Sequence, residues 1–142
     1  MNYLKTIFLL GLFHLIATDS YAQLFDKKEP LDVSYEDCLL KDTSNTNICN
    51  CAYETYGKWD KELEKAYNKL LKELKLPKDQ NAFIESQKSW KAYRDAEFQS
   101  YDNMFNKTGS KWTFERANDR INIVKARTLQ LREYYQILTS KH

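Results

Sequence analysis

Two polar side chains interrupt an apolar stripe in the middle of this chain of 142 residues. Gln87 and Arg94 fall at positions that helical spacing assigns to a buried face, and Asp95 follows directly. Because a buried polar group without a hydrogen-bond partner costs folding free energy, we expect partners for both side chains. The carboxylates of Asp60 and Glu64 are the candidates for Arg94. We interpret Arg94 as a cation that fixes helix register through an ion pair; contact with a ligand or partner protein is the alternative.

Catalytic chemistry has little support in the sequence. No sugar-binding cleft is indicated for a glycosidase pair. The carboxylates considered for such a pair are Asp60, Glu64, Asp95 and Glu97. The two histidines are His14, near the N-terminus, and His142, the last residue, which excludes Ser-His and Cys-His nucleophile pairs from the body of the domain. Gly57 and Gly109 are too few for a phosphate-binding loop. We expect no catalytic residue, no cofactor and no metal.

Three cysteines, Cys38, Cys49 and Cys51, lie within one short stretch. The last two are too close together to bridge each other comfortably, so Cys38 is expected to pair with one of them in an exported protein. Such a disulfide closes a loop of about a dozen residues, which stabilises a domain by roughly 3 kcal/mol. A soft-metal site of three thiolates is the alternative, but no fourth ligand lies nearby.

The aromatic residues divide into core and surface candidates. Trp59 and Trp90 fall on helical stripes and are expected in the core. Amphipathic aromatic side chains that remain on a surface are typical anchors of protein interfaces. The candidates for partner contact are Tyr53, Tyr93, Trp112 and Tyr134.

Apolar residues recur with a helical period in three long segments. They predict helices over residues 46–74, over 80–106, and from the turn at 108–110 to the end of the chain. A short helix over 35–41, capped by Ser34, is expected before them. Pro77 interrupts the helical pattern after the first long helix, and Asp79 is expected to cap the second. Short turns predict an all-α, antiparallel bundle of three long helices. A long coiled-coil homodimer is the competing arrangement.

The N-terminus has the pattern of a secretory signal peptide over residues 1–22. A basic start precedes an apolar run over residues 7–17, which is much shorter than the ~20 residues of a membrane span. Small residues at Ser20 and Ala22 indicate cleavage before Gln23. We therefore expect export to the periplasm or medium, a flexible leader over 23–34 and one domain over 35–142. The net charge of +2 does not indicate a nucleic-acid partner.

Spaced motifs give the chain a family resemblance. They are Cys51-Ala52 followed by Tyr56, Asp60, Leu63, Tyr67 and Leu70; the string from Gln87 to Ala96; Gly109-Ser110; and Arg127 with Leu131. The most specific is Gln-x-x-Trp-x-x-Tyr-Arg-Asp-Ala at residues 87–96. Together they resemble the LprI-like lysozyme-inhibitor domain family of secreted bacterial proteins, over nearly all of residues 38–138. The resemblance implies a small, disulfide-containing helical domain with a network of motif residues: Asp60, Glu64, Gln87, Trp90, Tyr93, Arg94 and Asp95.

This chain departs from the family pattern at two cysteines. Members usually carry one just after the Arg-Asp-Ala element, where this chain has Phe98, and one early in the last helix, where it has residues 117–119 without cysteine. Their joint absence implies that they pair with each other elsewhere in the family. The retained disulfide is then Cys38 with Cys51, which leaves Cys49 as an extra thiol. The contact between the last two long helices should therefore rest on packing alone.

The resemblance implies an exported, non-enzymatic domain that binds a protein partner, with lysozyme as the first candidate. The near-neutral charge of the chain offers no strongly acidic surface to a basic lysozyme. The alternative is an envelope structural or assembly module that self-associates through its helical faces. We expect a monomer or a weak homodimer.

Overall fold

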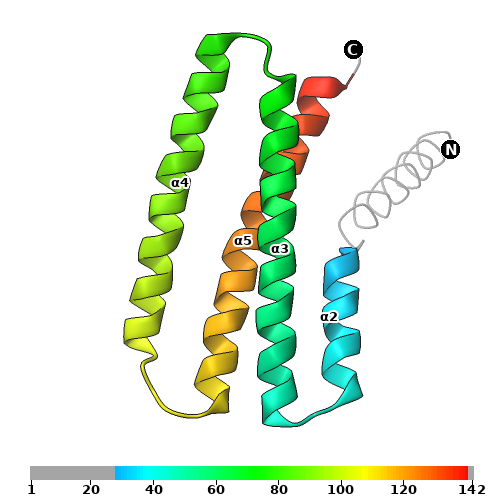
Figure 1. The fold of residues 1–142 in the computed structure, drawn as a ribbon, viewed down its shortest axis with the longest axis vertical. Helices are drawn as coiled ribbons and strands as arrows, with labels where there is room; N and C mark the ends of the chain where they lie inside the picture. The colour runs from blue at the N-terminus through cyan, green and yellow to red at the C-terminus, as the bar shows by residue number, and fades with distance from the viewer. Residues whose placement is uncertain (1–27, 141–142) are drawn as a thin grey trace, which may run out of the picture. The chain divides into compact units, whose positions relative to one another are not determined.

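The computed structural model describes residues 28–140, which form four α-helices and no strand (Figure 1). The helices are α2 (Pro30–Lys41), α3 (Asn45–Glu73), α4 (Pro77–Met104) and α5 (Ser110–Thr139). The expectation of an all-α fold is confirmed. The expected signal peptide lies outside the described residues, as do residues 23–27 of the expected leader. The chain divides into two compact units, residues 1–33 and 34–142. Of the first unit the structure describes only residues 28–33, which contain the start of α2.

Proline sets two helix starts earlier than the sequence predicted. We expected the short helix at Tyr35, but α2 begins at Pro30, so Ser34 lies inside the helix rather than at its cap. We expected the second long helix at Gln80, but α4 begins at Pro77, so Asp79 lies in its first turn and does not cap it. In both cases the ring fixes φ at a helical value and removes only an amide hydrogen that has no partner in the first turn.

The other two helices begin as the turn chemistry requires. Ser44 caps α3, because its side chain accepts a hydrogen bond from the Asn47 amide at 3.3 Å. Gly109 precedes α5 with φ of +115°, a backbone conformation that favours glycine. The long helices have 29, 28 and 30 residues, which agrees with the nearly equal lengths that the apolar periods predicted.

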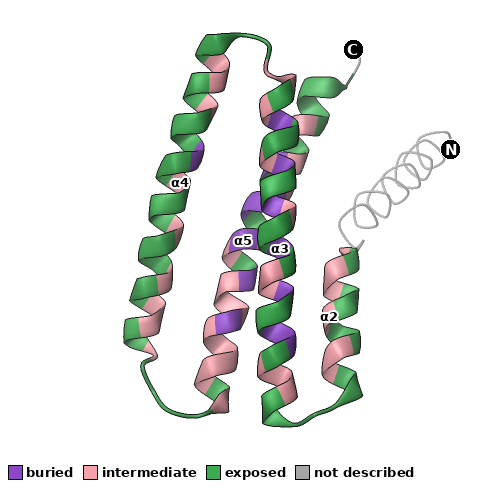
Figure 2. Ribbon diagram, viewed as in Figure 1, coloured by how far each residue is buried: buried purple, intermediate pink, exposed green. Residues whose placement is uncertain are grey.

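The core is formed by α3 and α5 (Figure 2). Their buried apolar residues are Cys51, Ala52, Trp59, Leu63, Ala66 and Leu70 of α3, with Ala117, Ile121, Val124 and Leu131 of α5. Trp59 is fully buried, as expected for the core. In α4 the only buried residue is Gln87, and Trp90, also expected in the core, is half-buried. Successive helices of residues 34–140 run in opposite directions (Figure 1), but the packing is uneven: α3 and α5 form a tight pair.

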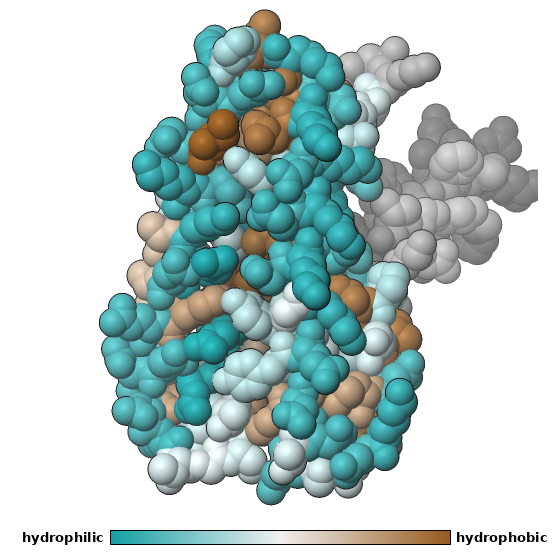
Figure 3. All heavy atoms as spheres, viewed as in Figure 1, coloured by the Kyte–Doolittle hydropathy of each residue, from teal (hydrophilic) through white to brown (hydrophobic). Residues whose placement is uncertain are grey.

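Aromatic rings connect α4 to α3. Tyr67 stacks on Phe83 with ring centroids 5.2 Å apart, and Tyr56 meets Phe98 edge-on at 6.0 Å. On the face drawn in Figure 3, apolar side chains remain visible between α3 and α4. Large half-exposed rings therefore take the place of a sealed apolar interface at this contact.

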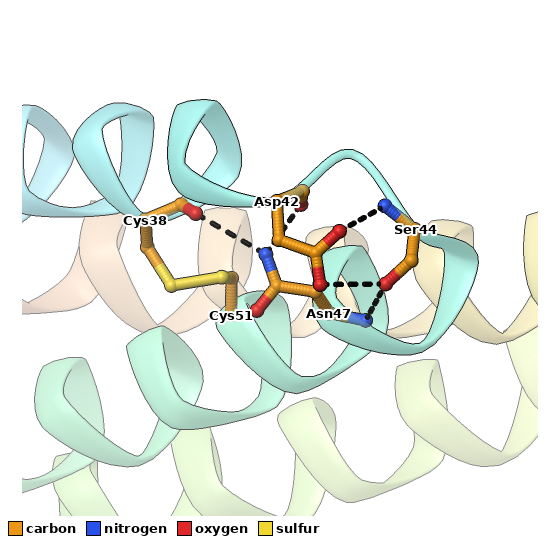
Figure 4. Close-up of a disulfide and its surroundings, with 5 residues drawn as sticks. All are labelled: Cys38, Asp42, Ser44, Asn47 and Cys51. Carbon is orange, nitrogen blue, oxygen red and sulfur yellow. Dashed lines mark hydrogen bonds between the residues drawn. A yellow bond between two sulfur atoms is a disulfide. The ribbon is translucent and has the colours of Figure 1, made fainter.

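A disulfide between Cys38 and Cys51 connects α2 to α3, which confirms the expected pair (Figure 4). The Asn47 side chain supports the turn between the two helices, because its amide nitrogen donates to the carbonyl oxygens of Cys38 at 3.3 Å and Asp42 at 2.5 Å. Cys49 forms no disulfide, and its thiol lies 3.4 Å from the Ser110 carbonyl oxygen. Within residues 28–140, no helix combines the length and the apolar character that a membrane span needs.

Candidate functional site

The motif residues Gln87 and Trp90 of α4 meet Arg127 of α5. Arg127 Nε donates to Gln87 Oε1 at 3.0 Å, and the guanidinium lies 5.7 Å from the centroid of the Trp90 ring. Gln87 is 3% exposed and Arg127 is 9% exposed. The expectation that Gln87 has a partner is therefore confirmed. The partner is a cation from the last helix, which the sequence pattern did not predict.

A spacing signal for Arg127 was present in the sequence. It lies three residues after Val124 and four before Leu131, two buried positions of the α5 stripe. Residues three and four apart share a helix face, so a cation at this position faces the interior of the fold. Burial lowers the pKa of Arg127, and the nearby Tyr134 opposes this by raising the pKa. Arginine nevertheless keeps its charge in proteins.

A hollow of about 430 Å³ opens beside this cluster. Its lining residues are Trp90 and Tyr93 from α4, with Asn122, Ile123, Ala126, Arg127 and Gln130 from α5. We call this hollow the α4–α5 groove. Arg127 is its buried member and donates through Nη1 to Gln130 Oε1 at 2.6 Å. Aromatic, amide and guanidinium groups around one hollow suit the binding of a protein surface rather than nucleophilic catalysis.

Arg94 has two carboxylate partners. Its Nε and Nη2 donate to Asp95 Oδ1 at 2.8 and 2.6 Å, while Asp60 of α3 lies 3.8 Å from Nη1. The guanidinium also lies 5.6 Å from the Trp90 ring centroid and 5.8 Å from that of Phe98. Asp60 is thus a cross-helix partner, as expected, but the shorter contact is with the neighbouring Asp95. That Arg94 sets helix register stays a prediction.

Glu64, the other candidate partner of Arg94, has a different contact. Its carboxylate accepts a hydrogen bond at 3.2 Å from Asn68, which lies one turn later on α3. No ion pair between Glu64 and Arg94 occurs within the part of the chain that the structure describes. The structure therefore favours Asp60 over Glu64 as the α3 partner of Arg94.

Ion pairs connect α4 and α5, the two helices for which we expected contact by packing alone. Arg120 of α5 pairs with Asp102 of α4 at 2.6 Å, and Arg116 lies 3.8 Å from the same carboxylate. Arg120 also lies 5.2 Å from the ring centroid of Phe98. The expectation that this contact rests on packing alone is wrong. Cations on α5 hold a carboxylate and a ring on α4.

The expected partner-contact residues do not gather at one site. Tyr93 lines the α4–α5 groove and is 54% exposed. Tyr134 is exposed and close enough to Arg127 to affect its pKa. Trp112 is half-buried and stacks on Phe105 with centroids 5.7 Å apart. Neither Trp112 nor the exposed Tyr53 lines the groove.

Among the described residues, no group of three or more His, Cys, Asp or Glu could hold a metal ion.

Comparison with known proteins places these residues in a family context. A family model described as "Lysozyme inhibitor LprI" matches residues 34–131. The crystal structure of an uncharacterized protein from Burkholderia thailandensis is similar to this chain, with a TM-score of 0.71 and 25% identity. The match covers 80% of this chain and 57% of that protein, so this chain spans little more than half of its length. No curated protein matches the chain.

Proposed function

The chain belongs to the LprI lysozyme-inhibitor family, and we propose that it is an exported, non-enzymatic domain that binds and inhibits a lysozyme. The observation that carries this proposal is the family match over residues 34–131. The arrangement of the motif supports it, because Gln87, Trp90 and Tyr93 lie along one helix face that meets Arg127. Tyrosine, tryptophan and arginine are the side chains most often found at the centres of protein interfaces.

The disulfide supports export. Disulfides persist in oxidising compartments and are rare in the cytosol, so the Cys38–Cys51 bond fits a periplasmic or extracellular protein. We propose that residues 1–22 are removed as a signal peptide and that the mature chain begins at Gln23. Intact-mass measurement of the exported protein tests this. A product that retains Met1 would contradict it.

We also infer that α4 completes an antiparallel bundle of three long helices. The contacts that support this are the rings that α4 shares with α3 and the hydrogen bond from Arg127 to Gln87. Such a bundle presents the α4–α5 groove on a fixed surface. This arrangement suits a domain that acts by binding.

A muramidase assay tests the proposed function. Purified mature chain, added in increasing amounts to an animal-type lysozyme, should lower the rate of cell-wall lysis in proportion to complex formed. A pull-down with the same lysozyme should recover both proteins. The control is the same assay with a muramidase of unrelated fold, which separates enzyme inhibition from protection of the cell wall. Undiminished lysis at a large molar excess, with no complex recovered, would refute inhibition of this lysozyme class.

Self-association is the second candidate function, and one observation favours it. The apolar residues of α5 continue beyond the last buried position, Leu131, and are exposed there. Tyr134, Ile137 and Leu138 are 44%, 63% and 49% exposed. Exposed apolar patches mark association surfaces. A mass that rises with concentration in sedimentation equilibrium, and that Ile137→Asp returns to the monomer value, would support an assembly module.

A further inference from the structure

We propose that the α4–α5 groove receives a carboxylate side chain from the surface of the protein partner, and that this carboxylate pairs with Arg127. The proposal rests on the proposed function, because the partner is taken to be a lysozyme. It adds the surface that binds and the chemistry of the partner group. Three observations carry it: the missing counter-charge of Arg127, its accessible nitrogen, and the side chains that surround it.

Arg127 is the exception among the arginines of this chain. The other four each have a carboxylate partner: Arg94 with Asp95 and Asp60, Arg116 and Arg120 with Asp102, and Arg132 with Glu62. Arg127 has no such ion pair within residues 28–140, although it is buried. Its hydrogen-bond partners, Gln87 and Gln130, are amides without net charge. A buried cation is thus left without a counter-charge at a hollow in the surface.

Such an arrangement favours an incoming anion. Burying a charge is costly unless the charge is paired, and amide oxygens with an aromatic ring offset only part of that cost. The lowered pKa of Arg127 has burial as its main cause and reflects this cost. A carboxylate is the side-chain group whose geometry matches a guanidinium, and a charge-assisted hydrogen bond is strongest where water is partly excluded.

The geometry leaves one donor available. Arg127 Nε and Nη1 donate to the two glutamines, whereas Nη2 donates to no group in the described part of the chain. Among the described residues, the fully enclosed side-chain nitrogen and oxygen atoms without a hydrogen-bond partner are Tyr35 Oη and Trp59 Nε1. Arg127 Nη2 is not one of these enclosed atoms. It therefore remains accessible to solvent and can donate to a carboxylate without breaking either existing hydrogen bond.

The walls of the groove suit the rest of an acidic side chain. Trp90 and Tyr93 offer ring surface for the methylene groups of a glutamate or aspartate, and Ile123 of α5 adds an apolar side chain. Asn122 and Gln130 add amide groups that can donate to the second carboxylate oxygen. The partner residue can be identified by substituting the carboxylates of the lysozyme one at a time.

Calorimetric titration of mature variants with lysozyme tests the pairing. Arg127→Lys keeps the charge but loses the forked geometry, and it should weaken binding at least tenfold. Tyr93→Ala changes an exposed wall residue, leaves the core intact and should weaken binding severalfold. Arg116→Lys is the matched control, because Arg116 already has a carboxylate partner and lies outside the groove; its affinity should be unchanged. Unchanged affinity of folded Arg127→Lys and Tyr93→Ala would overturn the groove while leaving lysozyme inhibition intact.

The partner side provides the second arm of the titration. One lysozyme variant with a single Asp→Asn or Glu→Gln substitution should bind the native chain as weakly as Arg127→Lys binds native lysozyme. Combining these two changes should cost little more than either alone, since they remove the same pair. Fully additive losses for every lysozyme carboxylate would overturn the pairing.

A third arm is independent of lysozyme. Blocked glutamate, N-acetylated and with its carboxyl terminus amidated, should shift the Arg127 Nε–H resonance at millimolar concentration. Blocked glutamine should not. The absence of a shift with the glutamate probe would overturn the proposal even if lysozyme binds elsewhere. A larger shift of the Arg127 Nε–H resonance with soluble muropeptides than with the glutamate probe would also overturn it. The carboxylate would then come from the cell wall rather than from a protein.

Discussion

The carboxyl group of Asp119 lies in an environment that disfavours its charge. Burial raises its pKa, and the carboxylates of Glu97 and Asp102 raise it further against the opposing effect of Arg120. A raised pKa in the folded state contributes stability below the unfolded pKa, and this contribution is lost as pH rises through the folded pKa. Asp119→Asn should therefore stabilise the domain at pH 7. Because solvent screens this half-buried site, the gain should not exceed about 1 kcal/mol.

Glu62 is the matched case of opposite sign. The hydrogen bond from Lys65 lowers its pKa more than burial raises it, and Arg132 lowers it further. A depressed pKa contributes stability above the unfolded pKa, and this is lost as pH falls through the folded pKa. Glu62→Gln should cost up to about 1 kcal/mol at pH 7 and nothing at low pH. Urea unfolding from pH 3 to pH 7 measures both variants, and shifts of the same sign would contradict this account.

Removal of the Arg94 side chain should destabilise the fold moderately. Its side chain is 18% exposed, but Asp95 and Asp60 are largely exposed, so the two ion pairs are weak. Contacts with the Trp90 and Phe98 rings add to the loss. Arg94→Ala should cost about 1–2 kcal/mol in thermal unfolding. Lys91→Ala, on the exposed face of α4, should change stability by less than about 0.5 kcal/mol. Equal changes in stability for Arg94→Ala and Lys91→Ala would contradict a structural role of Arg94.

The sequence identified which side chains need partners better than it identified the partners. Gln87 was expected to have a hydrogen-bond partner but none was named for it, and the structure shows that the partner is Arg127 of α5. Periodicity assigns a residue to a helix face, whereas the choice of partner depends on how α4 is rotated against α5. A rotation of this kind leaves no trace in a single helical pattern.

Among the elements, the two glycines outside the N-terminal segment should respond oppositely to alanine. Gly109 has φ of +115°, which side chains rarely adopt, so Gly109→Ala should cost about 1–3 kcal/mol. Gly57 lies inside α3, and an added Cβ would meet no atom within 4 Å. Gly57→Ala should therefore stabilise the domain by about 0.5–1 kcal/mol. Denaturant titration measures both, and destabilisation by Gly57→Ala would show that this face of α3 is occupied.

The disulfide between α2 and α3 should contribute through the loop that it closes. Cys38 and Cys51 are 13 residues apart, and a loop of that size corresponds to about 3 kcal/mol in the chain-entropy model. Reduction in a Cys49→Ser background, which prevents disulfide exchange, should lower the unfolding free energy by about that amount. Oxidised Cys49→Ser serves as the control and should remain close to the native chain. A loss below about 1 kcal/mol on reduction would mean that α2 adds little to the fold.

Helix starts show how far local signals go. The apolar period predicted the ends of α3 to within one residue, and the structure adds Ser44 as its N-terminal cap. The starts of α2 and α4 were placed too late, because Pro30 and Pro77 were assigned to the leader and to a break. Proline stops a helix from its interior but is well tolerated in the first turn, and the residue type alone does not separate the two cases.

At the scale of the whole molecule, the three long helices contribute unequally to stability. Equal lengths and similar stripes predicted an even bundle, whereas burial is concentrated between α3 and α5. The stripe of α4 carries Phe83, Trp90, Arg94 and Phe98, which are large or charged and remain half-buried. Apolar periodicity indicates which face turns inward. It does not indicate how closely two backbones approach, because this depends on side-chain volume and on the matching surface.

This inequality predicts two levels of opening in native-state hydrogen exchange. Because Gln87 is its only buried residue, α4 should open at a lower free energy than α3 and α5, with a weaker dependence on denaturant. Gln87→Ala should lower protection in α4 alone. Leu131→Ala, which removes about 2–5 kcal/mol from the core between α3 and α5, should lower protection in all three helices. If the amides around Trp90 instead exchange only when the whole domain unfolds, the rings and ion pairs of α4 make the domain one cooperative unit.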